Sequence, residues 1–95
     1  MRKNVSNQNT KKIQFVIEAV DAKKVSLVGE FNNWNPDADP MLMDKNGKWT
    51  KTKMLSPGNI EYKFWVDGQW IPDPDNMRTC PNCFGTRNNV VKVIS

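Results

Sequence analysis

The stretch "IEYKFWVDGQWI", residues 60–71, decides the fold class. Its first seven residues alternate between an apolar side with Ile60, Tyr62, Phe64 and Val66 and a mixed side with Glu61, Lys63 and Trp65. A period of two is typical of a strand with one buried face. The pair Asp67-Gly68 is typical of a two-residue hairpin turn. The stretch therefore predicts an antiparallel hairpin with one face on the core.

The predicted hairpin also fixes which side chains meet. Across a two-residue turn Val66 faces Gln69, so Trp65 pairs with Trp70 and Phe64 with Ile71. Because Phe64 faces the core, Lys63, Trp65 and Trp70 share the outward face. An exposed apolar cluster on a small domain is typical of a binding surface.

Shorter segments repeat the alternation and are separated by turn signals. The apolar positions recur in "IQFVIEAV" (13–20), "VSLVGEF" (25–31) and "NVVKVI" (89–94), and Asn46-Gly47 marks another hairpin. The segment "PDPDN" (72–76) is excluded from an interior strand, because proline donates no ladder hydrogen bond. No segment has helical spacing. The 95 residues therefore predict one all-β domain, an antiparallel sandwich.

The net charge of +4 is concentrated at one end of the chain. Four basic residues and no acid lie in the first 12 residues, and the other 83 hold 10 basic and 10 acidic residues. We predict a flexible basic tail over 1–12 and a folded domain over 13–95. A neutral domain does not favour nucleic acid. Since there is no membrane-length apolar run or secretory signal, we expect a cytoplasmic protein that does not bind membranes.

The residues for common catalysis are missing. The chain has no histidine, so the usual general base near neutral pH is absent. Asp73 and Asp75 flank Pro74 in a predicted loop and are expected to form a turn. The motif "CPNC" supplies only two of about four zinc ligands, so Cys80 and Cys83 are expected to be loop thiols, bridged or free; an intermolecular metal site or a redox switch is the alternative. We expect no enzyme, cofactor or metal.

Four tryptophans remain to be assigned. Trp49 follows the Asn46-Gly47 turn and is expected in the core. Trp65 either covers the sheet edge or contacts a ligand. Trp34 lies in "EFNNWNPDADP" (30–40) and is either a lid over the core or a ligand contact. Exposed rings mixed with lysine and asparagine suit a sugar, because a ring face stacks on C–H groups while polar side chains bind hydroxyls.

Three motifs carry a family resemblance. "VSLVGEFNNWNP" (25–36), "YKFWVDGQWIPDPDN" (62–76) and "GTRNNVVKV" (85–93) resemble the family 48 carbohydrate-binding modules. They are similar above all to the glycogen-binding domain of AMP-activated protein kinase beta subunits, and also to the N-terminal early-set domains of isoamylases and branching enzymes. The resemblance implies an immunoglobulin-like β-sandwich of the early-set type that binds α-1,4-linked glucans such as glycogen, starch and maltooligosaccharides.

The resemblance also implies the site. Its stacking tryptophans correspond to Trp34 and Trp70, and its polar residues to Lys63, Thr86 and Asn88. Phe84 takes the place of the apolar residue that supports or threads the glucan. The alternative function is a regulatory module that packs against a glycogen-metabolising enzyme or kinase without binding sugar itself.

Overall fold

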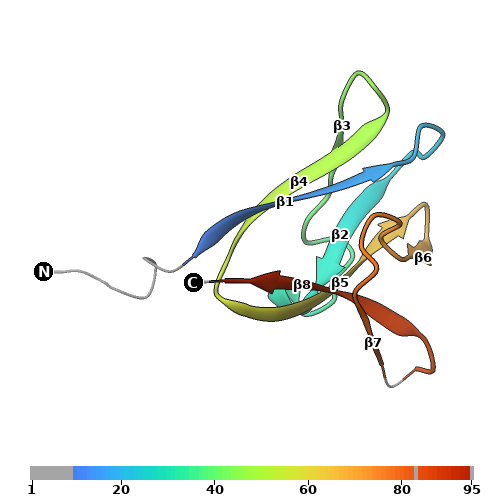
Figure 1. The fold of residues 1–95 in the computed structure, drawn as a ribbon. Helices are drawn as coiled ribbons and strands as arrows, with labels where there is room; N and C mark the ends of the chain where they lie inside the picture. Colours follow the sequence, from blue (N-terminus) through green and yellow to red (C-terminus); the bar gives the residue numbers. More distant parts are fainter. Residues whose placement is uncertain (1–9, 83, 95) are drawn as a thin grey trace, which may run out of the picture.

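The computed structural model describes residues 10–82 and 84–94, which form two antiparallel β-sheets (Figure 1). Its strands are β1 (Lys11–Glu18), β2 (Val25–Gly29), β3 (Leu42–Met43), β4 (Lys48–Leu55), β5 (Gly58–Val66), β6 (Gln69–Ile71), β7 (Thr79–Pro81) and β8 (Arg87–Val93). One 3-10 turn, η2 (Glu30–Asn32), follows β2. The predicted all-β class is confirmed. Within the described residues, no helix is long and apolar enough to cross a membrane.

The two sheets differ in size and pack as an immunoglobulin-like sandwich. The smaller sheet has the order β1-β4-β3, and the larger one has the order β2-β5-β8-β7, with β6 paired to β5. Lys11 and Lys12, which the sequence placed in the tail, are the first residues of β1. Residues 1–9 of the predicted tail lie outside the described residues.

The hairpin between β5 and β6 has the predicted register. Phe64 pairs with Ile71, Trp65 with Trp70, and Val66 with Gln69. Asp67 and Gly68 both have positive φ angles, 48° and 86°, as this turn type requires. The Asp67 carboxylate also accepts hydrogen bonds from the backbone N–H groups of Lys23 and Lys24. The hairpin tip is therefore tied to the loop before β2.

The core lies between the sheets and is centred on aromatic rings. Phe15 and Tyr62 meet edge to face with ring centroids 4.8 Å apart, and Phe64 and Leu27 are fully buried. Trp49 is 8% exposed, and its indole Nε1–H donates to the carbonyl of Ala19 over 2.9 Å. The prediction that Trp49 is a core residue is confirmed.

β2 departs from the predicted alternation, because all five of its residues are buried and it ends at Gly29. The segment before β3 lies along its free edge, where Leu27 N–H donates to Asp39 O and Met41 N–H to Val25 O. Gly29 approaches the backbone of the neighbouring strand β5 closely: a Cβ at Gly29 would lie 2.6 Å from the Glu61 carbonyl oxygen. Glycine is therefore required where the chain turns out of β2.

The segment 72–78 is irregular, as predicted from its prolines, but it is held by partly buried hydrogen bonds. Tyr62 donates its hydroxyl proton to Asp73 Oδ2 over 2.6 Å, and Asn76 Nδ2 donates to the same hydroxyl oxygen. Burial and the hydrogen bond to Asp73 raise the pKa of Tyr62. Asp73 also accepts from the backbone N–H of Asp75, which confirms its predicted role in a turn. The short strand β7 that follows was not predicted.

Candidate carbohydrate-binding site

Trp34 lies in an unusual backbone conformation directly after η2. Asn33 and Trp34 have φ angles of 57° and 59°, in the left-handed region that bulky residues rarely adopt. The Trp34 N–H donates to Gly29 O over 3.0 Å. A left-handed residue other than glycine costs roughly 1–2 kcal/mol, so the surrounding loop has to stabilise this conformation.

Asn32 and Asp39 supply that stabilisation. Asn32 Nδ2 donates to Leu27 O over 3.0 Å and to Asp39 Oδ2 over 2.8 Å, while its Oδ1 accepts from Gly29 N–H. Asp39 is nearly buried and its carboxylate accepts from Lys53 Nζ over 3.2 Å. Burial by itself would raise the pKa of Asp39, but the hydrogen bonds from Asn32 and Lys53 and the nearby lysine charges outweigh it and hold the pKa below its usual value.

This lowered pKa predicts how stability depends on pH. Since the folded-state pKa of Asp39 lies below the ordinary value, the ionised carboxylate stabilises the fold above about pH 4, and this stabilisation is lost as the pH falls through the folded-state pKa. We expect Asp39→Asn to lower the free energy of unfolding at pH 7 by about 1.5–3 kcal/mol, the usual value of a hydrogen bond to a charged group. Urea unfolding followed by tryptophan fluorescence measures it.

The exposed Asp37 provides the matched control. Its carboxylate makes only a 3.8 Å ion pair with Lys24, and both side chains are well exposed. Asp37→Asn should therefore change the unfolding free energy by less than about 0.5 kcal/mol. The difference between Asp39→Asn and the parent should shrink when unfolding is repeated at pH 3. A difference that is equal at pH 7 and pH 3 would contradict the assigned role of the ionised carboxylate.

Three indole rings meet on the outer side of the larger sheet. The ring centroids of Trp34 and Trp70 are 6.4 Å apart with planes at 70°, and those of Trp65 and Trp70 are 4.6 Å apart with planes at 66°. Trp70 stands between the other two and remains 44% exposed. Trp34 is only partly buried and is not a member of the core cluster. The ring of Trp65 packs against the ring of Trp70 and supports it.

Lys63 lies on the same face of β5 as Trp65 but is more enclosed than an outward lysine is expected to be. The residue is only 8% exposed, and its Nζ lies 3.3 Å from Thr86 Oγ1. Among the described residues, no carboxylate forms an ion pair with it. A lysine is rarely buried without a partner, and its ammonium group has three donors. Lys63 therefore has donors to offer a ligand.

Asn88 is nearly buried and holds a fixed side-chain amide. Its Nδ2 donates to Glu61 Oε1 over 2.9 Å, and its Oδ1 accepts from Asn82 Nδ2 over 2.9 Å. The amide nitrogen has a second N–H group, and the amide oxygen can accept a second hydrogen bond. The fixed amide can therefore offer one donor and one acceptor to a hydroxyl pair.

The loop from residue 82 to residue 87 is organised by Asn82, which the sequence did not identify. Asn82 Nδ2 donates to Thr86 Oγ1 over 2.8 Å, and its Oδ1 accepts from the N–H groups of Phe84 and Thr86. Gly85 supplies a positive φ of 82°. Phe84 is 85% exposed at the tip, and none of the ring pairs among the described residues includes it.

Five of the six predicted site residues thus form two groups in the structure, whereas the exposed ring of Phe84 belongs to neither. Trp34 and Trp70 are in ring contact, and Lys63, Thr86 and Asn88 are joined through hydrogen bonds that include Asn82. Lys63 and Trp65 link the groups, because they lie two residues apart on one face of β5. We call this combined surface the platform: Trp34, Trp70, Lys63, Thr86 and Asn88. The sequence signal for Asn82 was its place four residues before Thr86 in a glycine-containing turn.

Cys80 has a free, partly buried thiol next to the platform. Its pKa is raised by burial and by the neighbouring Glu61 carboxylate, so the thiol is protonated and weakly nucleophilic at neutral pH. Cys83, the other half of the predicted thiol pair, lies outside the described residues.

A small β-sandwich with indole rings beside an enclosed lysine and asparagine amides on one face is typical of a binding module. The family model described as "Glycogen recognition site of AMP-activated protein kinase" matches residues 12–95. Since this match covers most of the chain, the chain belongs to that family.

Curated relatives agree with the family. The chain is 37% identical over 71 residues to 5'-AMP-activated protein kinase subunit beta-2 of Mus musculus, an overlap of 75% of this chain and 25% of that protein. It is 38% identical over 71 residues to subunit beta-1 of Homo sapiens, with the same coverage. The aligned part thus spans about a quarter of the length of these relatives.

Proposed function

We propose that the domain binds α-1,4-linked glucans such as glycogen, starch and maltooligosaccharides without catalysing a reaction on them. The observation that carries this proposal is the enclosed lysine beside the indoles of Trp34 and Trp70: Lys63 is 8% exposed without an ion-pair partner among the described residues, and the exposed Trp70 lies on the same side of the sheet. Family membership supports the same ligand, since the family model is described as a glycogen recognition site.

The angle between the rings suits a curved ligand. Trp34 and Trp70 have planes at 70°, so one flat pyranose cannot stack on both. An α-1,4-linked chain curves, and successive glucosyl rings turn relative to one another. Each indole can then stack on a different ring, with its electron-rich face against C–H groups. The ammonium of Lys63 and the amide of Asn88 would bind the hydroxyls between them.

The surface is open, so we expect weak binding to one short chain. A dissociation constant between about 1 mM and 1 μM corresponds to roughly −4 to −8 kcal/mol. A long polysaccharide offers many equivalent sites and raises the apparent affinity when several domains bind one particle.

A kinase partner is a separate part of the proposal and rests on the relatives alone. The relatives are named as subunits of 5'-AMP-activated protein kinase, and the chain spans only a quarter of each. We propose that the domain brings such a partner to glycogen, with the platform left free for the sugar.

Co-sedimentation with glycogen tests the sugar proposal. The purified chain should pellet with glycogen, and maltoheptaose at millimolar concentration should release it into the supernatant. Cellulose, in which the linkage is β-1,4 and the chain is straight, is the matched control polymer and should not carry the chain down. Equal pelleting with both polymers, or none with glycogen, would contradict the proposal.

A further inference from the structure

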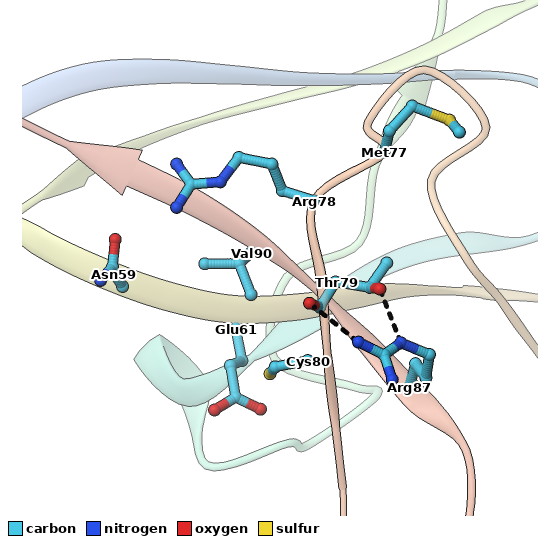
Figure 2. A pocket seen from close by; sticks show the side chains of 8 residues that line it. All are labelled: Asn59, Glu61, Met77, Arg78, Thr79, Cys80, Arg87 and Val90. Carbon is cyan, nitrogen blue, oxygen red and sulfur yellow. Dashed lines mark hydrogen bonds between the residues drawn. The ribbon is translucent and has the colours of Figure 1, made fainter.

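The outer face of the larger sheet has a hollow beside the platform (Figure 2). This cavity has a volume of about 620 Å³, within the range of small-molecule sites, and it is lined by Asn59, Glu61, Met77, Arg78, Thr79, Cys80, Arg87 and Val90. We call it the β7 groove. None of its residues is a member of the platform.

Glu61 joins the β7 groove to the platform. It lines the groove, and its Oε1 accepts a hydrogen bond from the platform residue Asn88 over 2.9 Å. Glu61 also lies two residues from Lys63 on the same face of β5, a spacing of about 7 Å along a strand. Cys80, at the groove, pairs directly with Asn88 in the β7–β8 register. A glucan chain that passes Asn88 on the platform therefore reaches the β7 groove within about one sugar length.

The lining of the groove offers both donors and acceptors. Arg87 is fixed by Thr79, with Nε donating to Thr79 Oγ1 over 2.7 Å and Nη2 to Thr79 O over 3.3 Å, and it keeps further N–H groups. Arg78 makes no side-chain hydrogen bond or ion pair with another residue in the described part of the chain. Glu61 supplies acceptors, and Asn59 supplies both donors and acceptors.

This mixture favours a neutral hydroxyl-rich ligand over a single anion. A phosphate site gathers arginines around one point, whereas Figure 2 shows the guanidinium groups of Arg78 and Arg87 well apart, on either side of Thr79. The Glu61 carboxylate would repel a phosphate, but it can accept from a sugar hydroxyl. Met77 and Val90 add apolar surface for C–H groups.

We propose that the β7 groove is a second carbohydrate subsite, which holds further glucosyl units of an α-glucan whose first units lie on the platform. This inference rests on the proposed function of the platform, and it adds to it a preference for longer chains. In it Arg78 donates to hydroxyls of the extended chain and Glu61 accepts from them.

Titration calorimetry with maltotetraose and maltodecaose tests the inference. The parent chain should bind maltodecaose more tightly than maltotetraose. Arg78→Ala should leave the affinity for maltotetraose unchanged and lower that for maltodecaose by about three- to tenfold, as expected for one or two lost hydrogen bonds. Lys45→Ala, which removes an exposed cation in the β3–β4 turn, is the control and should change neither. Thermal melting checks that each variant is folded.

The possible failures can be told apart. Equal affinities of Arg78→Ala and the parent for maltodecaose would overturn the groove inference alone. A parent chain that binds neither oligosaccharide would contradict the proposed function itself. Inorganic phosphate that binds the parent chain but not Arg78→Ala, while both bind maltodecaose with equal affinity, would overturn the assignment to a neutral ligand and assign the groove to an anion.

Discussion

Trp70→Ala and Trp34→Ala are each expected to remove most α-glucan binding while the domain remains folded. Loss of one stacking ring costs about 1.5–3 kcal/mol of binding free energy if the ring is largely covered by sugar, or roughly tenfold to more than a hundredfold in dissociation constant. Trp70 is 44% exposed and outside the core, so its removal should lower the melting temperature by only a few degrees. Calorimetry with maltoheptaose and thermal melting measure the two effects.

Trp34 allows a sharper control because its φ angle is 59°. Trp34→Gly removes the same ring as Trp34→Ala but relieves the left-handed backbone, which costs a residue other than glycine roughly 1–2 kcal/mol, so the glycine variant should be the more stable of the two. If the ring itself binds sugar, both variants lose binding to the same extent. A glycine variant that recovers binding would contradict the stacking role.

Trp49→Ala is expected to have the opposite effect, with severe loss of stability. A buried tryptophan truncated to alanine costs about 3–5 kcal/mol, and the lost hydrogen bond from Nε1 to Ala19 O adds about 0.5–1.5 kcal/mol. Domains of this size have a total stability of about 5–15 kcal/mol, so the variant should be largely unfolded at 37 °C or melt tens of degrees lower.

The same substitution at Trp70 is the matched control for Trp49→Ala, because only the location of the ring differs. Circular dichroism during a thermal scan separates the two variants. A stable, folded Trp49→Ala chain with weakened sugar binding, together with an unfolded Trp70→Ala chain, would show that the two rings have been assigned in reverse.

The sequence predicted the parts of the fold that depend on local rules. The register of Trp65 with Trp70 followed from a two-residue turn, which leaves no freedom in the pairing of the flanking strands. The burial of Trp49 followed from its position after Asn46-Gly47. Local alternation failed in β2, where all five residues are buried and the segment that pairs with the free edge comes from residues after the loop.

The site was predicted less completely, since it depends on contacts between distant segments. The burial of Lys63 reflects Thr86, which is 23 residues away. Asp39, which stabilises the Trp34 loop through Asn32, is itself paired with Lys53 of the smaller sheet. Neither contact leaves a periodic signal in the sequence. The bridging roles of Asn82 and Glu61 require the folded positions of β5, β7 and β8, as does the β7 groove.

The most direct test of the platform is an NMR titration of the four indole N–H signals with maltoheptaose in ¹⁵N-labelled protein. The signals of Trp34 and Trp70 should shift together with one dissociation constant, and that of Trp49, whose N–H is bonded to Ala19 O inside the core, should stay in place. A titration to millimolar maltoheptaose in which the Trp34 and Trp70 signals do not move, or in which the Trp49 signal alone moves, would contradict the account.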